Sequence, residues 1–292
     1  MVVRSSCWLA IVLASACGGG TPAAPTVTPS WPQTLTIRLT ETVTGAPVGS
    51  VAHVATGLPS TGTITRADYL ERVTAVETMT PVVDLIPLRP PFDLTFWRQL
   101  ARNSTEGALR PLVRQAGPVR IALKTVDEAG APVPAEALDM THAALEHAAA
   151  ELFEQPWIRS VERGIDRQGQ AGWVTILWDP DTAKNQCGAA ELGGTRIWLN
   201  YLKGSGCQCG GRLRERTVYH ELGHAVGLSH TSGYGGVMHI PALGCSIAWS
   251  DLERHHVAVL YARPRGNVDP DTDAGLQATR DARAAPPVIV ID

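Results

Sequence analysis

The sequence has no strong charge of either sign and, beyond its first residues, no long hydrophobic run. Its 292 residues carry 25 Lys and Arg against 28 Asp and Glu, with a formal net charge of −3. Nucleic-acid-binding domains are typically basic, so this balance argues against a nucleic-acid partner. No later stretch is long and apolar enough to span a membrane. Apolar residues make up 44% of the chain, enough for a sizeable core in one large or two modest domains.

The first residues are typical of an export signal. Arg4 supplies a positive start, an apolar run follows, and Ala14-Ser15-Ala16 is an A-x-A cleavage site. We therefore expect residues 1–16 to be a signal peptide. Cys17, followed by three glycines, then resembles the acylated cysteine of a bacterial lipoprotein. This resemblance implies an exported protein, anchored through lipid to the outer membrane or cell surface; ordinary secretion with an unmodified Cys17 is the alternative.

Cysteine is otherwise scarce. Residues 18–186 contain none, and residues 187–292 contain four, Cys187, Cys207, Cys209 and Cys245. An even number of cysteines in an exported chain predicts disulfides. Residues two apart rarely meet bridge geometry, so Cys207 and Cys209 should each pair with one of the other two. A second metal site at Cys187 and the C-x-C pair is the alternative, although structural zinc sites usually space their cysteines more widely.

Composition and pattern divide the exported chain into five segments. Residues 17–33 are rich in Gly, Pro, Thr and Ala, which predicts a flexible tether. Residues 34–90 contain period-two alternation and turn signals, which predict a small β-sandwich-like module. A connector over 91–118 leads to an α+β region over 119–262. The remainder, 263–292, is rich in Asp, Arg, Ala and Pro and is predicted to be disordered.

The α+β region alternates strand and helix patterns. Apolar alternation and apolar runs predict strands, and apolar positions that recur every three to four residues predict helices. A short helix is also predicted over 92–102, in the connector, with its aromatic residues used for packing. His255 and His256 lie on the last helix and are predicted to form a solvated face. The predicted strands cover residues 119–126, 172–178 and 195–200, and the predicted helices cover 135–154, 214–226 and 251–261.

The chemistry is concentrated in the motif H-E-x-x-H-x-x-G-x-x-H, which runs from His220 to His230. Residues four apart share one face of a helix, so His220 and His224 can both point at one metal ion. Gly227 is suited to end the helix in a left-handed turn, which would bring His230 back as a third ligand. Three histidines and a water make a catalytic zinc site with an open position. Glu221, next to the first ligand, can reach the metal-bound water.

The motif is followed by Met238, and together they resemble the metzincin zinc peptidases, most closely the matrixins. The short spacing from His230 to Met238 and the helical pattern from Asp251 to Tyr261 carry the resemblance to matrixins. It implies a zincin-like α+β catalytic domain over 119–262, with a twisted sheet and three main helices. It also implies one catalytic Zn²⁺ on the three histidines, Glu221 as general base, and Met238 as a floor beneath the metal.

The sequence departs from matrixins in two respects. Matrixin latency uses a propeptide cysteine on the zinc, and residues 18–186 contain no cysteine, so that mechanism is not available. Their Asp- and Gly-rich calcium loops are not recognisable, which leaves a Ca²⁺ requirement open.

The sequence thus predicts an exported zinc endopeptidase that hydrolyses peptide bonds of protein or peptide substrates by Glu-assisted attack of a zinc-bound water. Metzincins hold the substrate as an added strand on a sheet edge, which by position would lie near 187–191. The alternative is a lipid-anchored surface binding protein whose metzincin domain binds zinc but is catalytically silent.

Overall fold

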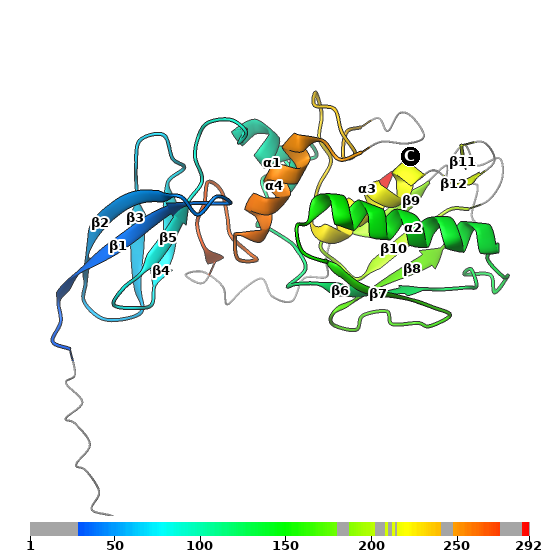
Figure 1. Ribbon diagram of the computed structural model, residues 1–292, viewed down its shortest axis with the longest axis horizontal. Helices are drawn as coiled ribbons and strands as arrows, with labels where there is room; N and C mark the ends of the chain where they lie inside the picture. The colour runs from blue at the N-terminus through cyan, green and yellow to red at the C-terminus, as the bar shows by residue number, and fades with distance from the viewer. Residues whose placement is uncertain are drawn as a thin grey trace, which may run out of the picture. The chain divides into compact units, whose positions relative to one another are not determined.

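The computed structural model describes residues 29–179, 187–201, 208–209, 212–213, 215–240, 248–274 and 288–291. Cys17, the expected signal peptide and most of the tether lie outside these residues. Within them, no helix is both long enough and apolar enough to cross a membrane. The described chain is mixed α+β, as the sequence predicts, with helices and several sheets (Figure 1).

Two small sheets form the first part of the fold (Figure 1). The central strand of the larger one, β1, pairs antiparallel with β2 and parallel with β5, while β3 and β4 pair antiparallel with each other. Leu35, Ile37 and Leu39 of β1 are buried and the residues between them are exposed, as period-two alternation predicts. The strands are β1 (Gln33–Glu41), β2 (Pro47–Ala55), β3 (Ser60–Ile64), β4 (Arg72–Val76) and β5 (Val82–Leu85).

A six-stranded sheet follows, in the order β13-β9-β10-β8-β6-β7. Strands β10, β8, β6 and β7 are parallel to one another. Strand β9 is antiparallel to both of its neighbours, β10 and β13. The three strands predicted in this region are confirmed as β6, β8 and β10. The strands of this sheet are β6 (Val119–Leu123), β7 (Ile158–Arg163), β8 (Trp173–Trp178), β9 (Gly188–Glu191), β10 (Arg196–Leu199) and β13 (Val288–Ile291). A separate short antiparallel pair consists of β11 (Gln208–Cys209) and β12 (Arg212–Leu213).

The helices are α1 (Leu94–Arg102), α2 (Ala135–Leu152), α3 (Glu215–Val226) and α4 (Asp251–Tyr261). All four were predicted, to within a few residues at their ends. The buried positions of α2 include Leu138, Leu145 and Leu152, which recur at helical spacing as predicted. Helix α3 packs against α2 and against strands β9 and β10, and α2 also contacts the sheet at β7. In Figure 1, α3 lies partly behind α2.

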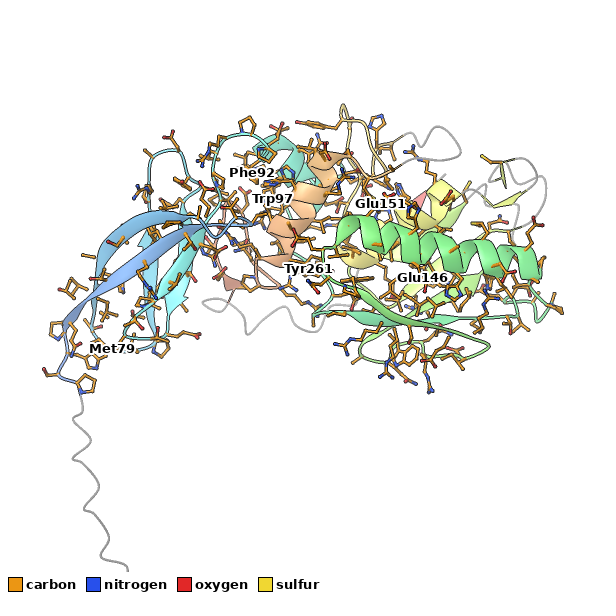
Figure 2. All side chains as sticks on the ribbon, in the orientation of Figure 1. Met79, Phe92, Trp97, Glu146, Glu151 and Tyr261 are labelled. Carbon is orange, nitrogen blue, oxygen red and sulfur yellow. The ribbon has the colours of Figure 1, made fainter. Side chains whose placement is uncertain are left out.

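His256 is buried, contrary to the prediction that His255 and His256 form a solvated face of α4. Its ring centroid lies 5.1 Å from that of Phe92 and 5.0 Å from that of Phe96. Phe92 and Trp97, labelled in Figure 2, extend this aromatic cluster, with their ring centroids 6.2 Å apart. Burial lowers the pKa of His256 to about 4, so a neutral ring packs there. The prediction failed because the aromatic partners come from a distant part of the chain.

Buried ion pairs join β4 and β5 to the residues that follow α4. Asp271, which is fully buried, lies 3.0 Å from Arg72 and 2.7 Å from Arg263. Arg263 also pairs with Asp84 of β5. Burial alone would raise the pKa of Asp84, but the charges of Arg263 and Arg72 hold it below its usual value. The two small sheets are thereby held to the C-terminal part of the chain by charges that are removed from water.

The predicted disordered tail is therefore wrong for its first part. Arg263, Asn267 and Asp271 are buried, and the Asn267 side-chain amide donates to both Asp271 and Asp273 at 2.9 Å. A composition rich in Asp and Arg suggested a solvated segment, but these charges pair with one another and with β4 and β5. Residues 275–287 lie outside the described part of the chain.

Asp271→Ala should lower the free energy of unfolding by about 3–5 kcal/mol, because it removes a carboxylate shared by two buried guanidinium groups. Asp139→Ala is the matched control, since Asp139 pairs with Arg163 on the surface, where such a pair contributes little. Urea unfolding followed by circular dichroism measures both variants. Equal midpoints for the two would contradict a stabilising role for the buried cluster.

Candidate metal centre

Three histidines meet at the C-terminal end of α3. His220 and His224 lie one turn apart on the helix, and His230 follows the turn that ends it. Their exposed fractions are 0%, 0% and 4%. One potential ligand atom from each ring lies within 4.8 Å of the others. This buried three-histidine group could hold a metal ion, and it consists of the residues that the motif predicts.

Gly227 makes the turn that returns His230 to the site. Its φ of +120° is one that residues with a side chain rarely adopt, and its N–H donates to the carbonyls of Gly223 and His224, which closes the helix. A Cβ at Gly227 would also lie 2.1 Å from the carbonyl oxygen of Val113. Both the backbone angle and the close approach of a neighbouring segment therefore require glycine here.

Each imidazole is oriented by a contact at Nδ1. That atom of His220 lies 2.8 Å from the carbonyl oxygen of Val237, and that of His224 lies 2.6 Å from the carbonyl oxygen of Leu228. Nδ1 of His230 contacts the carboxylate of Glu106. A ring that donates from Nδ1 presents Nε2 as its lone-pair nitrogen, which is the tautomer that a metal ligand requires.

The donors fit a metal ion. Burial, together with the neighbouring charge at His230, lowers the pKa of His220 to about 3. Burial likewise lowers the pKa of His224 well below its ordinary value, so both rings are neutral at pH 7. Within the described residues, Nε2 of His224 has no hydrogen-bonding partner. A buried polar atom without a partner is costly, and coordination to a metal would satisfy it.

Glu221 lies beside this cluster with its carboxylate buried. No described residue hydrogen-bonds to either of its oxygens, and burial raises its pKa well above the ordinary value. The backbone of Gly188 on β9 packs directly on it, since a Cβ at that position would lie 2.6 Å from Oε1 of Glu221. The carboxylate is therefore held between α3 and β9, next to the histidines, without being used in any ion pair of the described fold.

Met238 packs against α3 in the turn that follows the motif. Its side chain is fully buried, and a Cβ on Gly223 of the motif would lie 2.5 Å from its sulfur. Its N–H donates to the buried carboxylate of Glu253 at 2.8 Å. Arg216 of α3 donates to the carbonyls of Gly236 and two of the residues that follow it. The turn is thus fixed to α3 by an arginine and to α4 by a glutamate.

Three residues that hold the site were not singled out from the sequence: Glu106, Arg216 and Glu253. Glu253 had a usable signal, because it lies three residues after Ser250 and the two form a capping box at the start of α4. No local pattern marks Glu106, which lies in the connector and contacts His230 across the fold. Arg216 reads in sequence as an ordinary polar residue of a helix.

Of the predicted cysteines, Cys187 and Cys209 are both disulfide-bonded. Cys207 and Cys245 lie outside the described residues, so the connectivity remains a prediction. A disulfide sulfur offers no thiolate to a metal, which weighs against the alternative of a second metal site that uses Cys187.

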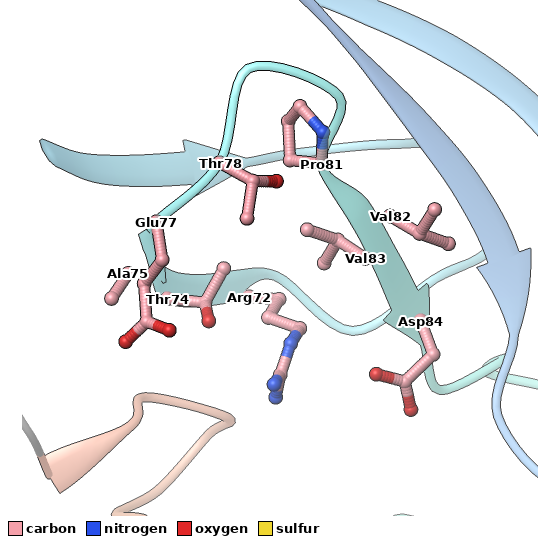
Figure 3. A pocket seen from close by; sticks show the side chains of 9 residues that line it. All are labelled: Arg72, Thr74, Ala75, Glu77, Thr78, Pro81, Val82, Val83 and Asp84. Atoms are coloured by element: carbon pink, nitrogen blue, oxygen red, sulfur yellow. The ribbon is translucent and has the colours of Figure 1, made fainter. Parts of the chain in front are cut away.

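A cavity of about 200 Å³ lies elsewhere, along β4 and β5 (Figure 3). Arg72 and Asp84 are in its wall, but both belong to the buried ion-pair cluster described above. These two charged groups are therefore used to hold the fold together, and the three-histidine group is the better candidate for a functional site.

Comparison with known proteins adds no family to this geometry. No family model matches the chain, and no curated protein matches it. The function must therefore be argued from the site itself.

Glu106→Ala should weaken zinc binding by about 10–100-fold, since losing a carboxylate that orients a ligating histidine typically has that effect. Glu106→Gln retains an acceptor oxygen and should lose less. Glu146→Ala is the control, because Glu146 lies on the exposed side of α2 (Figure 2). Competition with a chromophoric chelator measures all three. If Glu106→Ala binds zinc as tightly as the control, Glu106 has no role in positioning His230.

Proposed function

We propose that this protein is a zinc-dependent endopeptidase of the metzincin type. The observation that supports this most is the buried carboxylate of Glu221, which has no partner among the described residues and lies beside the buried three-histidine group. A carboxylate kept only for stability would be paired with a donor, as Glu253 is with Met238. An unpaired one with a raised pKa is typical of a group that exchanges a proton during a reaction.

Zinc is the metal that best suits this donor set. Three neutral imidazoles from an i, i+4 pair and a following turn are the ligands of many catalytic zinc sites, which keep one position open. When bound, the metal would supply Lewis-acid activation of a water molecule and of the scissile carbonyl. Calcium is not part of the proposal, because the histidine cluster is the one metal-binding group found in the described residues.

Glu221 would carry the proton through the reaction. As water oxygen bonds to the peptide carbonyl carbon, the carboxylate accepts the water proton. It then delivers a proton to the leaving nitrogen as the C–N bond breaks. Burial, which raises the pKa of Glu221, makes it a stronger base than an exposed glutamate. Its position against the backbone of Gly188 fixes its place relative to strand β9.

The surrounding architecture supports a metzincin rather than an isolated metal motif. Met238 packs against Gly223 of the motif, and α4 begins soon after that turn. The helix that carries the ligands packs on β9 and β10. Extended peptides commonly bind by adding a strand to a sheet, so we assign the substrate to the side of β9 that faces away from β10.

A lipid-anchored binding protein with a silent zinc site is the second candidate. Glu221 argues against it, because a pure binder gains nothing from an unpaired buried carboxylate, which costs stability. Peptide hydrolysis with and without a chelator distinguishes the two functions.

Glu221→Ala should keep about one zinc per chain and lose roughly 10²–10⁴-fold in peptide hydrolysis, because a general base contributes about that much. His224→Ala should instead lose the metal, because two imidazoles make a poor site. His142→Ala serves as the control, since His142 lies on α2 outside the cluster. Elemental analysis and hydrolysis of a peptide library provide the measurements. A Glu221→Ala protein that cleaves at the wild-type rate would rule out this role.

Export and anchoring through Cys17 are part of the proposal. Cys17→Ser should move the mature protein from the membrane fraction to the soluble fraction, because the acylated side chain is lost. Fractionation of cells that express each form, with Ser15→Thr as a control outside the acylated position, measures this. A wild-type protein that is already soluble after export would show that Cys17 carries no anchor.

A further inference from the structure

Strand β9 is paired on both sides, and its outer neighbour comes from the far end of the sequence. β10 lies on one side, with Ile197 opposite Ala190. β13 lies on the other, with Val288 opposite Glu191 and Ile291 opposite Gly188, in antiparallel register. Without β13, the backbone groups on this side of β9 would form a sheet edge open to another strand.

The register places the end of β13 at the proposed active site. Ile291 is opposite Gly188, and Gly188 is the residue whose backbone packs on the carboxylate of Glu221. Helix α3, which carries Glu221 and two of the three histidines, packs on β9 itself. The chain segment 288–291 therefore runs along the strand that borders the catalytic carboxylate and reaches the level of that carboxylate.

The sequence of the segment suits this position. Val288-Ile289-Val290-Ile291 consists of β-branched apolar residues, which favour the extended backbone of a strand. The strand it joins is Gly188-Ala189-Ala190-Glu191, whose first three residues have small side chains that leave the backbone accessible to a partner. Antiparallel strand addition of this kind is also how an extended peptide binds to a sheet edge.

We propose that the segment Val288–Ile291 occupies the substrate strand of the active site and blocks it in cis. This inference rests on the proposed peptidase function. Covalent attachment makes the segment an intramolecular competitor, so a free peptide must displace it before it can pair with β9. The occupant also indicates the substrate class, an extended peptide segment that pairs with β9 through its backbone.

Proline substitutions in the full chain test the pairing. Residues in an antiparallel strand alternate between hydrogen-bonded and non-hydrogen-bonded pairs, so proline at two adjacent positions removes a donor to β9 whichever pair is bonded. Ile289→Pro with Val290→Pro should therefore release the segment. Ile289→Ala with Val290→Ala is the matched control, because it shortens the same side chains and keeps both N–H groups.

The double-proline chain should show an increase in kcat/KM for a fluorogenic peptide of about tenfold or more, mainly through a lower KM, because an intramolecular competitor has been removed. The double-alanine chain should stay close to the wild type. A synthetic peptide with the sequence of residues 286–292 should inhibit the proline variant competitively and the wild type only weakly. An active proline variant with an unchanged KM and no sensitivity to this peptide would overturn the inference.

Two readouts do not depend on hydrolysis. Amide hydrogen exchange at Ala189 and Ala190, whose N–H groups point to opposite sides of β9, should be slow in the wild type and the alanine variant. In the proline variant the amide that faces β13 should exchange fast, while the one that faces β10 stays slow. A labelled peptide with the sequence of residues 286–292 should bind a double-proline chain that also carries the Glu221→Ala substitution. If these results hold and no variant cleaves any peptide, the peptidase function fails but the occupancy of β9 stands. If exchange is equally fast in all three chains, the segment does not occupy β9 and the inference fails.

Discussion

The candidate site depends on keeping the imidazoles of His220 and His224 neutral and correctly oriented while they are buried. Burial removes the charge of His220 and His224, but it also removes the solvent that would otherwise satisfy their nitrogens. Each Nδ1 instead contacts one acceptor of the protein. The acceptor for His220 lies in the turn that contains Met238, that for His224 just after the end of α3, and that for His230 in the connector before β6. Connector, helix and turn must therefore all be in place before the cluster has its geometry. Such dependence is expected where a buried polar group costs several kcal/mol if it is left without partners.

Close backbone approach is the second constraint, and glycine meets it at four points around the site. A Cβ on Gly188 would collide with Glu221, and one on Gly223 with Met238. At Gly227 it would collide with a carbonyl of the connector, and at Gly236 with the Glu253 carboxylate, 2.5 Å away. These contacts bring β9, the methionine turn, the connector and α4 to the same short helix. A larger residue at any of them would push apart two segments that the site needs together.

Local patterns predicted the parts of this protein that are determined locally. Apolar periodicity predicts strands β6, β8 and β10 of the six-stranded sheet and all four helices. Helical spacing and one glycine predict the three-histidine group. The positions that were missed depend on partners distant in sequence. His256 is buried because Phe92 and Phe96 surround it, and Glu106 matters because the fold brings it to His230. The acidic and basic residues after α4 suggested disorder, since the sequence does not show that Arg72 and Asp84 meet them.

In the proposed peptidase, a strand edge left open beside Glu221 would create a conflict. A peptide substrate needs unpaired backbone groups on that edge, yet unpaired edges also favour association with other chains. The protein limits the exposed length, because β9 covers only Gly188–Glu191. It then covers the edge with β13, which comes from its own sequence and pairs along the whole of β9. Strand β13 would keep the edge of β9 paired until a peptide that pairs with β9 more strongly displaces it. In the proposed peptidase, the strength of the β9–β13 pairing, made by four residue pairs, would therefore limit which peptides reach Glu221.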